Sequence, residues 1–554
     1  MSLVEVEGLR VAFGGAEVVR GVTFSIDPGE CVALVGESGS GKSVTARALL
    51  GLAGRGAAVR AERLAIEERD LRTAGEREWR RVRGARVGLV LQDALVSLDP
   101  LRPIGREIGD VLRLHTPLSA VERLGRAVDV LHRVGMPDAW ERVHALPGAL
   151  SGGLRQRALI ASAIALDPPL VIADEPTTAL DMSVQRRVLE ELGRLKRAGT
   201  GILLISHDLG VVAGLADRVL VLRDGAVVEE GPTQSVLRRP SAPYTRELVR
   251  AVPAGVPRGT PLLGGAGTGS VSAEAPAPAD AASGAEPVGE SEHEPEREPV
   301  LRVHAVSKSF PGRVAPRIAV DDASLELRAG ETLGIVGESG SGKTTLARMV
   351  LGLETPDSGS VELFGAPWSG VAERARRERR RRIGMVSQDT ASSFDPRWSV
   401  ARTVEDALPA GGARAERRAR VRELLDEVGL DAGLAARRPD TLSGGQRQRL
   451  AIARTLAGAP EVLVLDEPVS ALDVTVQARI LDLLDRLQRR HGLAVLFISH
   501  DLDVIAHMSD RIVVMHEGRI VETGPTGRVL ASPAAAYTAQ LVADAPRALA
   551  AARE

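Results

Sequence analysis

Cysteine is almost absent from this chain of 554 residues, since Cys31 is the only one. A single thiol forms neither an intramolecular disulfide nor a cysteine metal cluster, so iron–sulfur and zinc–thiolate sites within the chain are excluded. The apolar residues around Cys31 lead us to interpret it as a small buried hydrophobe in a strand.

Long apolar runs are also missing. No stretch approaches the ~18–20 residues that a membrane-spanning helix needs. The first residues alternate apolar and acidic side chains and lack the basic start and apolar block of a signal peptide. We therefore expect a cytosolic protein without a membrane span. If it acts at a membrane, other chains supply the spanning part.

An excess of charge of either sign is absent, because the formal net charge is −2. Such a balance gives no overall attraction to nucleic acid or to anionic lipid. The basic run at 374–382 has the composition of a nucleic-acid patch, but a basic segment at 77–83 takes the same place in the first half. We favour a solvated helix face and predict no nucleic-acid partner.

A duplicated set of motifs dominates what is present. Six motifs occur twice in the same order, at offsets of 292 to 301 residues. A repeat of this length indicates a duplicated domain and not a solenoid unit. Between the copies, residues 256–298 are rich in Ala, Gly, Pro, Ser and Glu, so they cannot bury enough apolar surface to offset their ordering entropy. We predict a first domain at 1–255, a flexible linker at 256–298 and a second domain at 299–554.

Each domain has short apolar runs that lead directly into motifs. Such continuous runs are typical of strands buried on both faces, in a parallel sheet covered by helices. Helical periodicity between residues 92 and 151, and again between 388 and 443, predicts a helical subdomain inserted into each α/β core. The apolar runs lie at 31–35, 170–173, 201–205, 332–336, 462–465 and 494–498.

A glycine loop follows the first apolar run of each domain. The pattern Gly-x-x-x-x-Gly-Lys-[Ser/Thr] lets backbone N–H groups wrap a phosphate chain at a helix N-terminus. Lys42 and Lys343 would reach the β- and γ-phosphates of ATP, and the hydroxyls of Ser43 and Thr344 would ligate Mg²⁺. The duplication disfavours an ordinary Gly/Ser turn. The residues assigned to the nucleotide are Gly36, Ser38, Gly39, Gly41, Lys42, Ser43 and Val44, then Gly337, Ser339, Gly340, Gly342, Lys343, Thr344 and Thr345.

Paired carboxylates end another buried run in each copy. Asp174 and Asp466 are placed to hold Mg²⁺ directly or through water. Glu175 and Glu467 follow them and can orient or deprotonate the attacking water. A lone Asp-Glu-Pro would more simply be a solvated strand end, but both copies lie 23 residues after a Ser-Gly-Gly motif.

The Ser-Gly-Gly motif suits a second phosphate contact. Its serine would cap the following helix, and the glycines would let a γ-phosphate approach the helix N-terminus. A plain helix N-cap is the alternative. The residues concerned are Ser151, Gly152 and Gly153, then Ser443, Gly444, Gly445 and Gln446.

Three further residue types are assigned by their repetition. His207 and His500 end apolar runs, where we predict a γ-phosphate contact. Gln92 and Gln388 are placed beside the metal and the reacting phosphate by position alone. Phe13 and Phe310 precede the glycine loops and could stack on adenine, with core packing as the competing interpretation.

These motifs together resemble the ATP-binding cassette (ABC) ATPases, over both domains. The resemblance implies two tandem nucleotide-binding domains, each a P-loop parallel-sheet α/β core with an antiparallel β subdomain and an inserted helical subdomain. It also implies head-to-tail closure, with ATP and Mg²⁺ between the glycine loop of one cassette and the Ser-Gly-Gly signature of the other. Asp181 and Asp473 would lie across the interface. One site would combine Lys42, Ser43, Gln92, Asp174, Glu175 and His207 with Ser443 to Gln446, and the other Lys343, Thr344, Gln388, Asp466, Glu467 and His500 with Ser151 to Gly153.

Finer features resemble the ATPase subunits of dipeptide, oligopeptide and nickel importers. They are the segments after each glutamine, at 92–100 and 388–396, and the tails that carry Tyr244 and Tyr537, the only tyrosines. Two departures stand out: Leu154 replaces the usual Gln or Met after the signature, and the tail lacks a cysteine cluster.

The resemblance implies the ATP-hydrolysing motor of an importer. Its partners would be two membrane permease subunits and an external solute-binding protein, and it would sit peripherally on the cytoplasmic face of the cell membrane. The alternative is a soluble tandem cassette acting in translation or DNA repair. The first role would bring a long charged helical linker and the second zinc-ligand cysteines, neither of which the sequence contains. An exporter ATPase fits the motifs but fits the tails less well.

Overall fold

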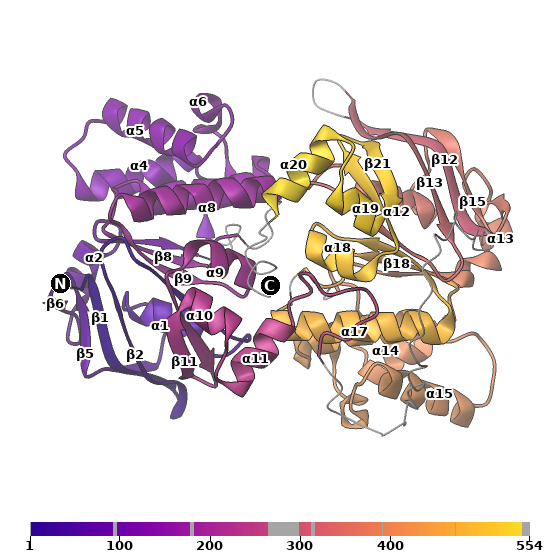
Figure 1. The fold of residues 1–554 in the computed structure, drawn as a ribbon, viewed down its shortest axis with the longest axis horizontal. Helices are drawn as coiled ribbons and strands as arrows, with labels where there is room; N and C mark the ends of the chain where they lie inside the picture. Colours follow the sequence, from indigo (N-terminus) through magenta and orange to yellow (C-terminus); the bar gives the residue numbers. More distant parts are fainter. Residues whose placement is uncertain are drawn as a thin grey trace, which may run out of the picture.

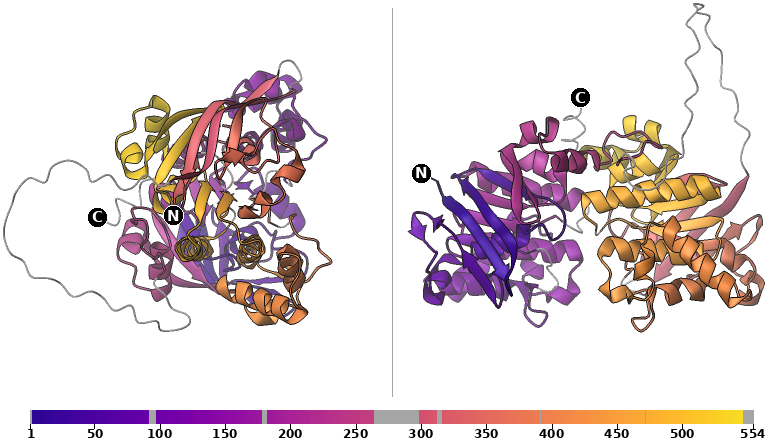
Figure 2. Two further views of the ribbon diagram at one scale, coloured as in Figure 1. Left: turned by 90° about the vertical axis from the view of Figure 1, so that its right-hand side faces the viewer. Right: turned by 90° about the horizontal axis from the view of Figure 1, so that it is seen from below.

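The computed structural model describes residues 2–91, 97–177, 182–263, 298–311, 316–390, 392–470 and 472–545. Gln92, Asp181 and most of the predicted linker lie outside these ranges. The two repeats form two side-by-side α/β bodies (Figures 1 and 2). Their helical subdomains occupy diagonally opposite corners of Figure 1, as two copies related by an approximate twofold axis should.

A six-stranded sheet forms the centre of the first domain, in the order β11-β10-β3-β9-β8-β7. The neighbours β10, β3, β9, β8 and β7 pair in parallel, and β11 is antiparallel to β10. Because β3, β8 and β9 are buried along their whole length, both faces of the sheet are covered. The strands are β3 (Cys31–Val35), β7 (Val87–Val90), β8 (Leu170–Asp174), β9 (Gly201–Ile205), β10 (Arg218–Arg223) and β11 (Ala226–Pro232).

An antiparallel sheet covers one face of this central sheet. Side chains alternate along a strand, so Val32 and Leu34 of β3 join the core shared with the antiparallel sheet, whereas Cys31, Ala33 and Val35 join the core under the helices. Cys31 is fully buried, which confirms the prediction, and burial raises the pKa of its thiol. The strands are β1 (Val4–Phe13), β2 (Ala16–Ile26), β4 (Ala57–Arg60), β5 (Arg63–Ile66) and β6 (Arg69–Asp70).

Helices complete the first domain. The inserted helical subdomain packs over the second face, and α7 links it to β7. Its helices are α4 (Ile104–His115), α5 (Ala120–Arg133), α6 (Ala139–Arg142) and α7 (Gly152–Ile164). The remaining helices are α1 (Lys42–Ala48), α2 (Glu76–Val82), α8 (Met182–Arg197), α9 (Leu209–Leu215), α10 (Thr233–Arg238) and α11 (Pro243–Arg250).

The second domain repeats both sheets, with the six-stranded order β17-β18-β19-β14-β20-β21 and the antiparallel order β13-β12-β15-β16. This confirms the predicted fold of two α/β domains, each with an antiparallel sheet and a helical insertion. The strands are β12 (Pro299–Phe310), β13 (Arg317–Arg328), β14 (Thr332–Val336), β15 (Ser358–Leu363), β16 (Ala366–Pro367), β17 (Ile383–Val386), β18 (Val462–Asp466), β19 (Ala494–Ile498), β20 (Arg511–His516) and β21 (Arg519–Pro525). The helices are α12 (Lys343–Val350), α13 (Glu373–Arg376), α14 (Val400–Ala407), α15 (Arg414–Glu427), α16 (Gly444–Leu456), α17 (Val474–His491), α18 (Leu502–Met508), α19 (Thr526–Ala531) and α20 (Ala536–Asp544).

The basic run at 374–382 differs from the predicted solvated helix face. It forms only the short α13 and a 3₁₀ turn. Three of its guanidinium groups lie 5.6–5.9 Å from the ring of the fully buried Trp368, so they cover an aromatic side chain at the edge of the antiparallel sheet.

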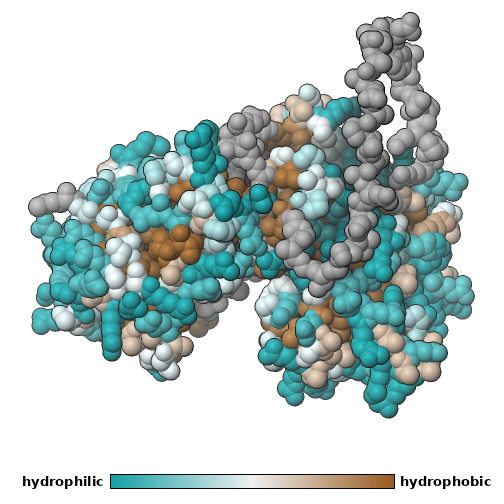
Figure 3. Space-filling model, turned by 60° about the horizontal axis from the view of Figure 1, so that its bottom comes forward, coloured by the Kyte–Doolittle hydropathy of each residue, from teal (hydrophilic) through white to brown (hydrophobic). Residues whose placement is uncertain are grey.

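The two domains touch through their tail helices. Helix α11 of the first domain lies against α17 of the second, and α20 of the second lies against α8 of the first (Figure 1). The face drawn in Figure 3 is mostly hydrophilic, has apolar areas on both domains and is hollowed between them. Among the described residues, no helix combines the length and the apolar character needed to cross a membrane.

The first residues of the predicted linker lie against the second domain. The Arg258 guanidinium pairs with Asp510 and donates to Gln488 Oε1 at 3.0 Å. The backbone N–H groups of Leu262 and Leu263 donate to Asp482 at 2.9 and 3.1 Å. The segment 256–263 is therefore packed, in contrast to the free linker predicted from residue 256.

Candidate nucleotide site

Each glycine loop joins the C-terminal end of the central strand of its sheet to a helix. A Cβ at Gly36 would lie 2.2 Å from the carbonyl oxygen of Leu222, and one at Gly337 would lie 2.2 Å from that of Met515, so only glycine fits these two positions. The loops turn tightly enough for the following lysine to reach back. Lys42 Nζ donates to the carbonyl oxygens of Gly36 and Glu37 at 2.8 Å.

The second loop has the same geometry, because Lys343 Nζ donates to Gly337 O at 2.7 Å and to Glu338 O at 2.8 Å. Burial lowers the pKa of Lys42, while nearby carboxylates, first Glu175, oppose this shift. A buried ammonium in a loop of backbone donors is suited to binding an anion.

A hydroxyl and a buried carboxylate meet beside each lysine. Ser43 Oγ donates to Asp174 Oδ1 at 2.9 Å, and Thr344 Oγ1 donates to Asp466 Oδ1 at 3.4 Å. Asp174 is 1% exposed, and its Oδ2 atom accepts no hydrogen bond. Burial raises the pKa of Asp174 and of Asp466. The Arg47 guanidinium lies 3.9 Å from Asp174 Oδ2 without a hydrogen bond. A buried carboxylate next to a hydroxyl is the donor set that a hard cation such as Mg²⁺ prefers, so these residues fit that ion.

The glutamates that follow these aspartates have strained backbones. Glu175 and Glu467 have φ values of 51° and 49°, in the left-handed region, which non-glycine residues avoid. Each Glu N–H donates to the neighbouring strand, to Ile205 O at 2.9 Å or Ile498 O at 3.0 Å. The turn directs each carboxylate away from the buried aspartate, toward the histidine that ends the neighbouring strand.

The predicted histidines lie next to these glutamates. His207 Nδ1 is 3.3 Å from Glu175 Oε1, and His500 Nδ1 is 3.2 Å from Glu467 Oε1. Burial disfavours the imidazolium, but the hydrogen bond and the charge of the glutamate outweigh it, so the pKa of each histidine is raised. In the second copy, Gln388 Nε2 donates to the other oxygen of Glu467 at 2.8 Å.

A cavity of about 320 Å³ borders the first glycine loop. It is lined by the loop, Lys42, Glu175 and His207, and by two residues of the other domain, Leu472 and Asp473. The site is thus shared between the two domains. The signature residues Ser443, Gly444 and Gly445 are not among the lining residues, whereas Asp473, which was predicted to lie across the interface, is one of them.

Both signature motifs form helix N-termini. Ser443 Oγ accepts a hydrogen bond from Gln446 N at 3.3 Å, while the Gln446 side chain accepts one from Ser443 N at 3.0 Å, which makes a capping box for α16. Ser151 Oγ accepts from Leu154 N at 3.4 Å at the start of α7, where leucine cannot complete the box. Both serines are exposed.

The two predicted adenine-stacking rings differ in their surroundings. Phe13 ends β1 and is half-buried against the core that also contacts Val44. Phe310 ends β12, is 39% exposed and has the Lys308 ammonium 5.7 Å from its ring centre. An exposed ring is available for stacking, whereas Phe13 also contributes to packing.

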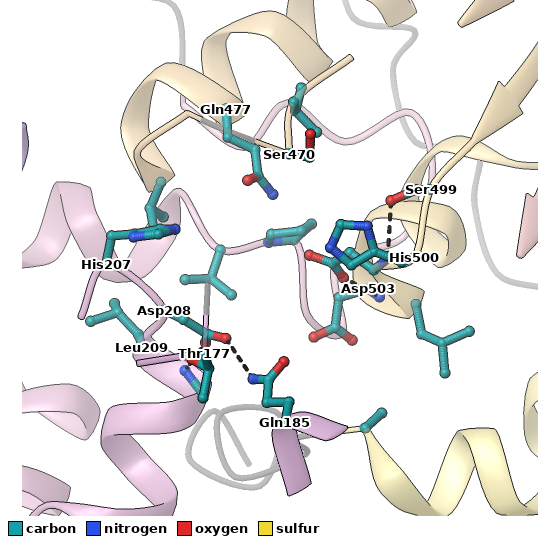
Figure 4. Close-up of a pocket in the computed structure, with 18 of the residues that line it drawn as sticks. Thr177, Gln185, His207, Asp208, Leu209, Ser470, Gln477, Ser499, His500 and Asp503 are labelled. Carbon is teal, nitrogen blue, oxygen red and sulfur yellow. Dashed lines mark hydrogen bonds between the residues drawn. The ribbon is translucent and has the colours of Figure 1, made fainter. Parts of the chain in front are cut away.

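A second cavity of about 160 Å³ lies between the two domains (Figure 4). It brings together both histidines, His207 and His500, with Asp208 and Asp501. Each aspartate caps the helix that follows it, α9 or α18. Burial raises the pKa of Asp501, and the charge of Asp208 adds to this shift.

Sequence reasoning missed the contacts of the two tyrosines with the glycine loops. The Glu37 N–H donates to Tyr244 Oη at 2.9 Å, and the Glu338 N–H donates to Tyr537 Oη at 3.2 Å. The in-register repetition of the only two tyrosines was a signal for this role. It identified a subfamily tail, but linear spacing could not show that the tail returns to the loop.

Two family models match the chain. The ABC transporter model matches residues 19–178 and 320–470, and the model of the C-terminal region of oligopeptide/dipeptide transporters matches residues 228–275. The second match contains the tail that carries Tyr244.

Three full-length relatives have transport names. The peptidoglycan transport ATP-binding protein YejF of Agrobacterium fabrum is 40% identical over 98% of this chain and 96% of its own length. The oligopeptide transport ATP-binding protein OppD of Mycobacterium tuberculosis is 40% identical over 98% of both chains. The glutathione import ATP-binding protein GsiA of Escherichia coli is 39% identical over 98% of this chain and 90% of its own length. These names do not favour the alternative in translation or DNA repair.

Proposed function

This chain belongs to the ATP-binding subunits of ABC transporters, in the fused tandem form of peptide-type importers, and we propose a role for each residue of its two nucleotide sites. The chain is an ATPase that couples ATP hydrolysis to import through membrane permeases. It associates peripherally with the membrane. The proposals below concern the residues, the metal ion, the partners and the transported solute.

The glycine loops bind the phosphates of ATP. Backbone N–H groups of each loop, with Lys42 or Lys343, neutralise the β- and γ-phosphates. Phe13 and Phe310 provide aromatic surface for the adenine. The remaining nucleotide contacts come from Ser38, Gly39, Gly41, Val44, Ser339, Gly340, Gly342 and Thr345.

The buried Asp and the loop hydroxyl hold Mg²⁺ in each cassette. The ligands are Ser43 and Asp174 in the first site and Thr344 and Asp466 in the second, with Gln92 and Gln388 beside them. When bound, Mg²⁺ supplies positive charge that offsets the charge of the phosphates.

Each glutamate acts on the attacking water. Glu175 and Glu467 orient it and take its proton, which requires an ionised carboxylate. In the second cassette, burial raises the pKa of Glu467, but the hydrogen bond and charge of His500 prevail and the pKa is lowered. His207 and His500 contact the γ-phosphate while they hold the glutamate in position. The signature residues Ser151, Gly152 and Gly153, then Ser443, Gly444, Gly445 and Gln446, reach the phosphate when the cassettes close.

The partners are two permease subunits and an external solute-binding protein, and the chain sits on the cytoplasmic face of the membrane. Peptides or small peptide-like solutes are the imported class. Two findings support this class. Residues 228–275 match the model of the C-terminal region of oligopeptide/dipeptide transporters, and the relatives have oligopeptide, glutathione and peptidoglycan transport names.

One observation carries the ATPase proposal. In both cassettes a hydroxyl of the glycine loop meets a buried aspartate, and the next residue is a strained glutamate that contacts a histidine. Burial of these charges and backbone strain both cost stability, which a purely structural role does not explain.

The test is ATP turnover of Glu175→Gln and of Glu467→Gln, each in the full chain. We expect each single variant to lower turnover at its own site by about 100-fold, because the general base is lost while the side-chain shape is kept, so the kcat of the full chain should fall by about half or more. Glu423→Gln, on the exposed side of α15, is the matched control and should retain the wild-type rate. Wild-type turnover in either site variant would contradict the proposal of two active sites.

A further inference from the structure

The two tail helices reach the glycine loops through their tyrosines. Tyr244 lies on α11, is 5% exposed, and its phenol oxygen accepts the Glu37 N–H at 2.9 Å. Its ring is held by the Arg223 guanidinium, 5.0 Å from the ring centre. In the second cassette Tyr537 accepts the Glu338 N–H and stacks on His516 at 3.9 Å. In each cassette, one backbone N–H of the glycine loop is therefore held by a tyrosine of the tail helix.

The side chain of Glu37 reaches the other cassette. Its Oε1 atom accepts a hydrogen bond from Thr475 Oγ1 at 2.5 Å. Thr475 is fully buried and is the second residue of α17. Its hydroxyl lies 3.1 Å from Oδ1 of Asp473, which lines the cavity around Lys42. Tyr244, Glu37 and Thr475 thus form one hydrogen-bonded chain that crosses the domain boundary, and its last hydroxyl lies beside Asp473 at the nucleotide cavity.

The same two helices also make a direct ion pair. Glu247 of α11 accepts from Arg479 of α17 at 3.0 Å. Residues three or four positions apart share a helix face. Tyr244 and Glu247 therefore lie on one face of α11, and Thr475 and Arg479 lie on one face of α17. The tail helix binds its own glycine loop and the opposite cassette with the same face.

The pseudo-equivalent half has a similar ion pair, with its arginine in register but its carboxylate at another position of the tail helix. Arg186 of α8, 293 residues before Arg479, pairs with Asp544 of α20 at 3.0 Å. Asp544 and Tyr537 are seven residues apart, two helical turns, and so share a face of α20. Each tail is thus attached both to the glycine loop of its own cassette and to the helix that follows the Leu-Asp motif of the other.

We propose that Tyr244 and Tyr537 are positioning residues for ATP hydrolysis, each of which ties a glycine loop to a tail helix docked on the opposite cassette. The proposal rests on the assignment of the glycine loops as phosphate sites. The phenol satisfies a half-buried N–H and so fixes the direction of the loop at Glu37. That direction lets the Glu37 carboxylate meet Thr475, and through it Asp473. Closure of the cassettes is thereby transmitted to the phosphate loop through the tail, and not only through nucleotide.

A double-mutant cycle on the full chain tests this connection. The variants are Tyr244→Phe, which removes only the phenol oxygen, Thr475→Val, which removes only the hydroxyl, and the two together. The readouts are kcat and KM for MgATP, with the thermal midpoint of each variant as a check on folding. Tyr537→Phe, alone and combined with Thr475→Val, is the matched control, because its phenol contacts the other loop.

We expect Tyr244→Phe and Thr475→Val each to lower turnover at the first nucleotide site by about three- to tenfold, so the kcat of the full chain should fall by up to about half. The double variant should be no slower than the slower single variant, because both changes interrupt one chain. Tyr537→Phe with Thr475→Val should be slower than either single variant, because the two changes act at different sites and their losses add. Unchanged kcat in Tyr244→Phe, or multiplication in the Tyr244→Phe and Thr475→Val pair, would overturn the proposal. A lowered thermal midpoint with normal kcat would overturn it too, since the phenol would then be purely structural.

The outcome is separable from the ATPase proposal. If the wild-type chain hydrolyses ATP and Glu175→Gln lowers that rate, the assignment of the nucleotide sites holds, whatever the result of the double-mutant cycle. If the glutamate variants hydrolyse ATP normally, the catalytic assignment is wrong and the cycle reports only on the loop.

Discussion

At Glu175 and Glu467 the backbone adopts a strained conformation that lowers stability, and the side chain is the one proposed to act in catalysis. The left-handed φ angles of 51° and 49° place each Cβ close to its own carbonyl. Glycine would remove that strain, but it would also remove the carboxylate that the histidine contacts. The sequence predicted both glutamates as catalytic from their position after an aspartate. It could not predict the strain, because a Glu-Pro dipeptide does not specify a left-handed residue.

The strain predicts an order of stability between two inactive variants, Glu467→Gly and Glu467→Ala. Both lose the carboxylate, so both should lose ATP turnover at that site. The left-handed strain of about 1–2 kcal/mol remains in the alanine variant and is absent in the glycine variant. The greater unfolded-state entropy of glycine offsets about 0.4–1 kcal/mol of this. We therefore expect Glu467→Gly to be more stable by roughly 0.5–1 kcal/mol in denaturant titrations. If the alanine variant were the more stable one, the left-handed geometry at residue 467 would be wrong.

Helices and strands that are specified by their own residues could be predicted from the sequence, whereas contacts between residues far apart in the chain could not. The apolar runs before each motif became fully buried strands, because strands covered on both faces require continuous apolar sequence. The signature serines became N-caps. The basic run at 374–382 is solvated as expected, but it does not form one continuous helix, and its contacts with Trp368 depend on a strand edge outside the run. The tails were recognisable from their tyrosines, but their docking as helices on α8 and α17 depends on the other domain.

The two signature helices predict opposite effects of two single exchanges. Helix α16 has a complete capping box through Gln446, and α7 lacks one because Leu154 takes that position. Leu154→Gln should raise the free energy of unfolding of the first cassette by about 0.3–1 kcal/mol, and Gln446→Leu should lower that of the second by a similar amount. Both free energies can be measured in denaturant titrations of the full chain, from the unfolding transition of each cassette. Equal effects of the same sign would contradict a capping origin.

At the scale of the whole molecule, the sequence predicts the residues of the composite site but not their distances across the two domains. Motif order predicts which residues of each cassette meet a nucleotide. The cavity at the first glycine loop does include Leu472 and Asp473 of the other domain. The signature serines and glycines are not among its lining residues. No local pattern encodes the distance between loop and signature. The linker boundary has a similar cause: composition averaged over a window hid the specific contacts of Arg258 and Asp482.

The connection between the cassettes has an anchored part at 256–263, and we predict that residues 270–279 serve only as a tether. Arg258 is 24% exposed on its side chain and bonds to Asp510, Gln488 and Thr332 of the second domain. Arg258→Ala removes these bonds, so the free energy of unfolding of the second cassette should fall by roughly 1–2 kcal/mol. Deleting ten residues at 270–279 should leave both that free energy and ATP turnover unchanged, since loop-closure entropy varies slowly with length.

The two variants form a matched pair, because both alter the same connection at different points. The two variants are compared by their stability in thermal and denaturant unfolding, and by their rate of ATP turnover. A deletion that slows turnover would show that residues 270–279 do more than join the cassettes. An Arg258→Ala variant with wild-type stability would show that the contacts of segment 256–263 contribute nothing to the second domain.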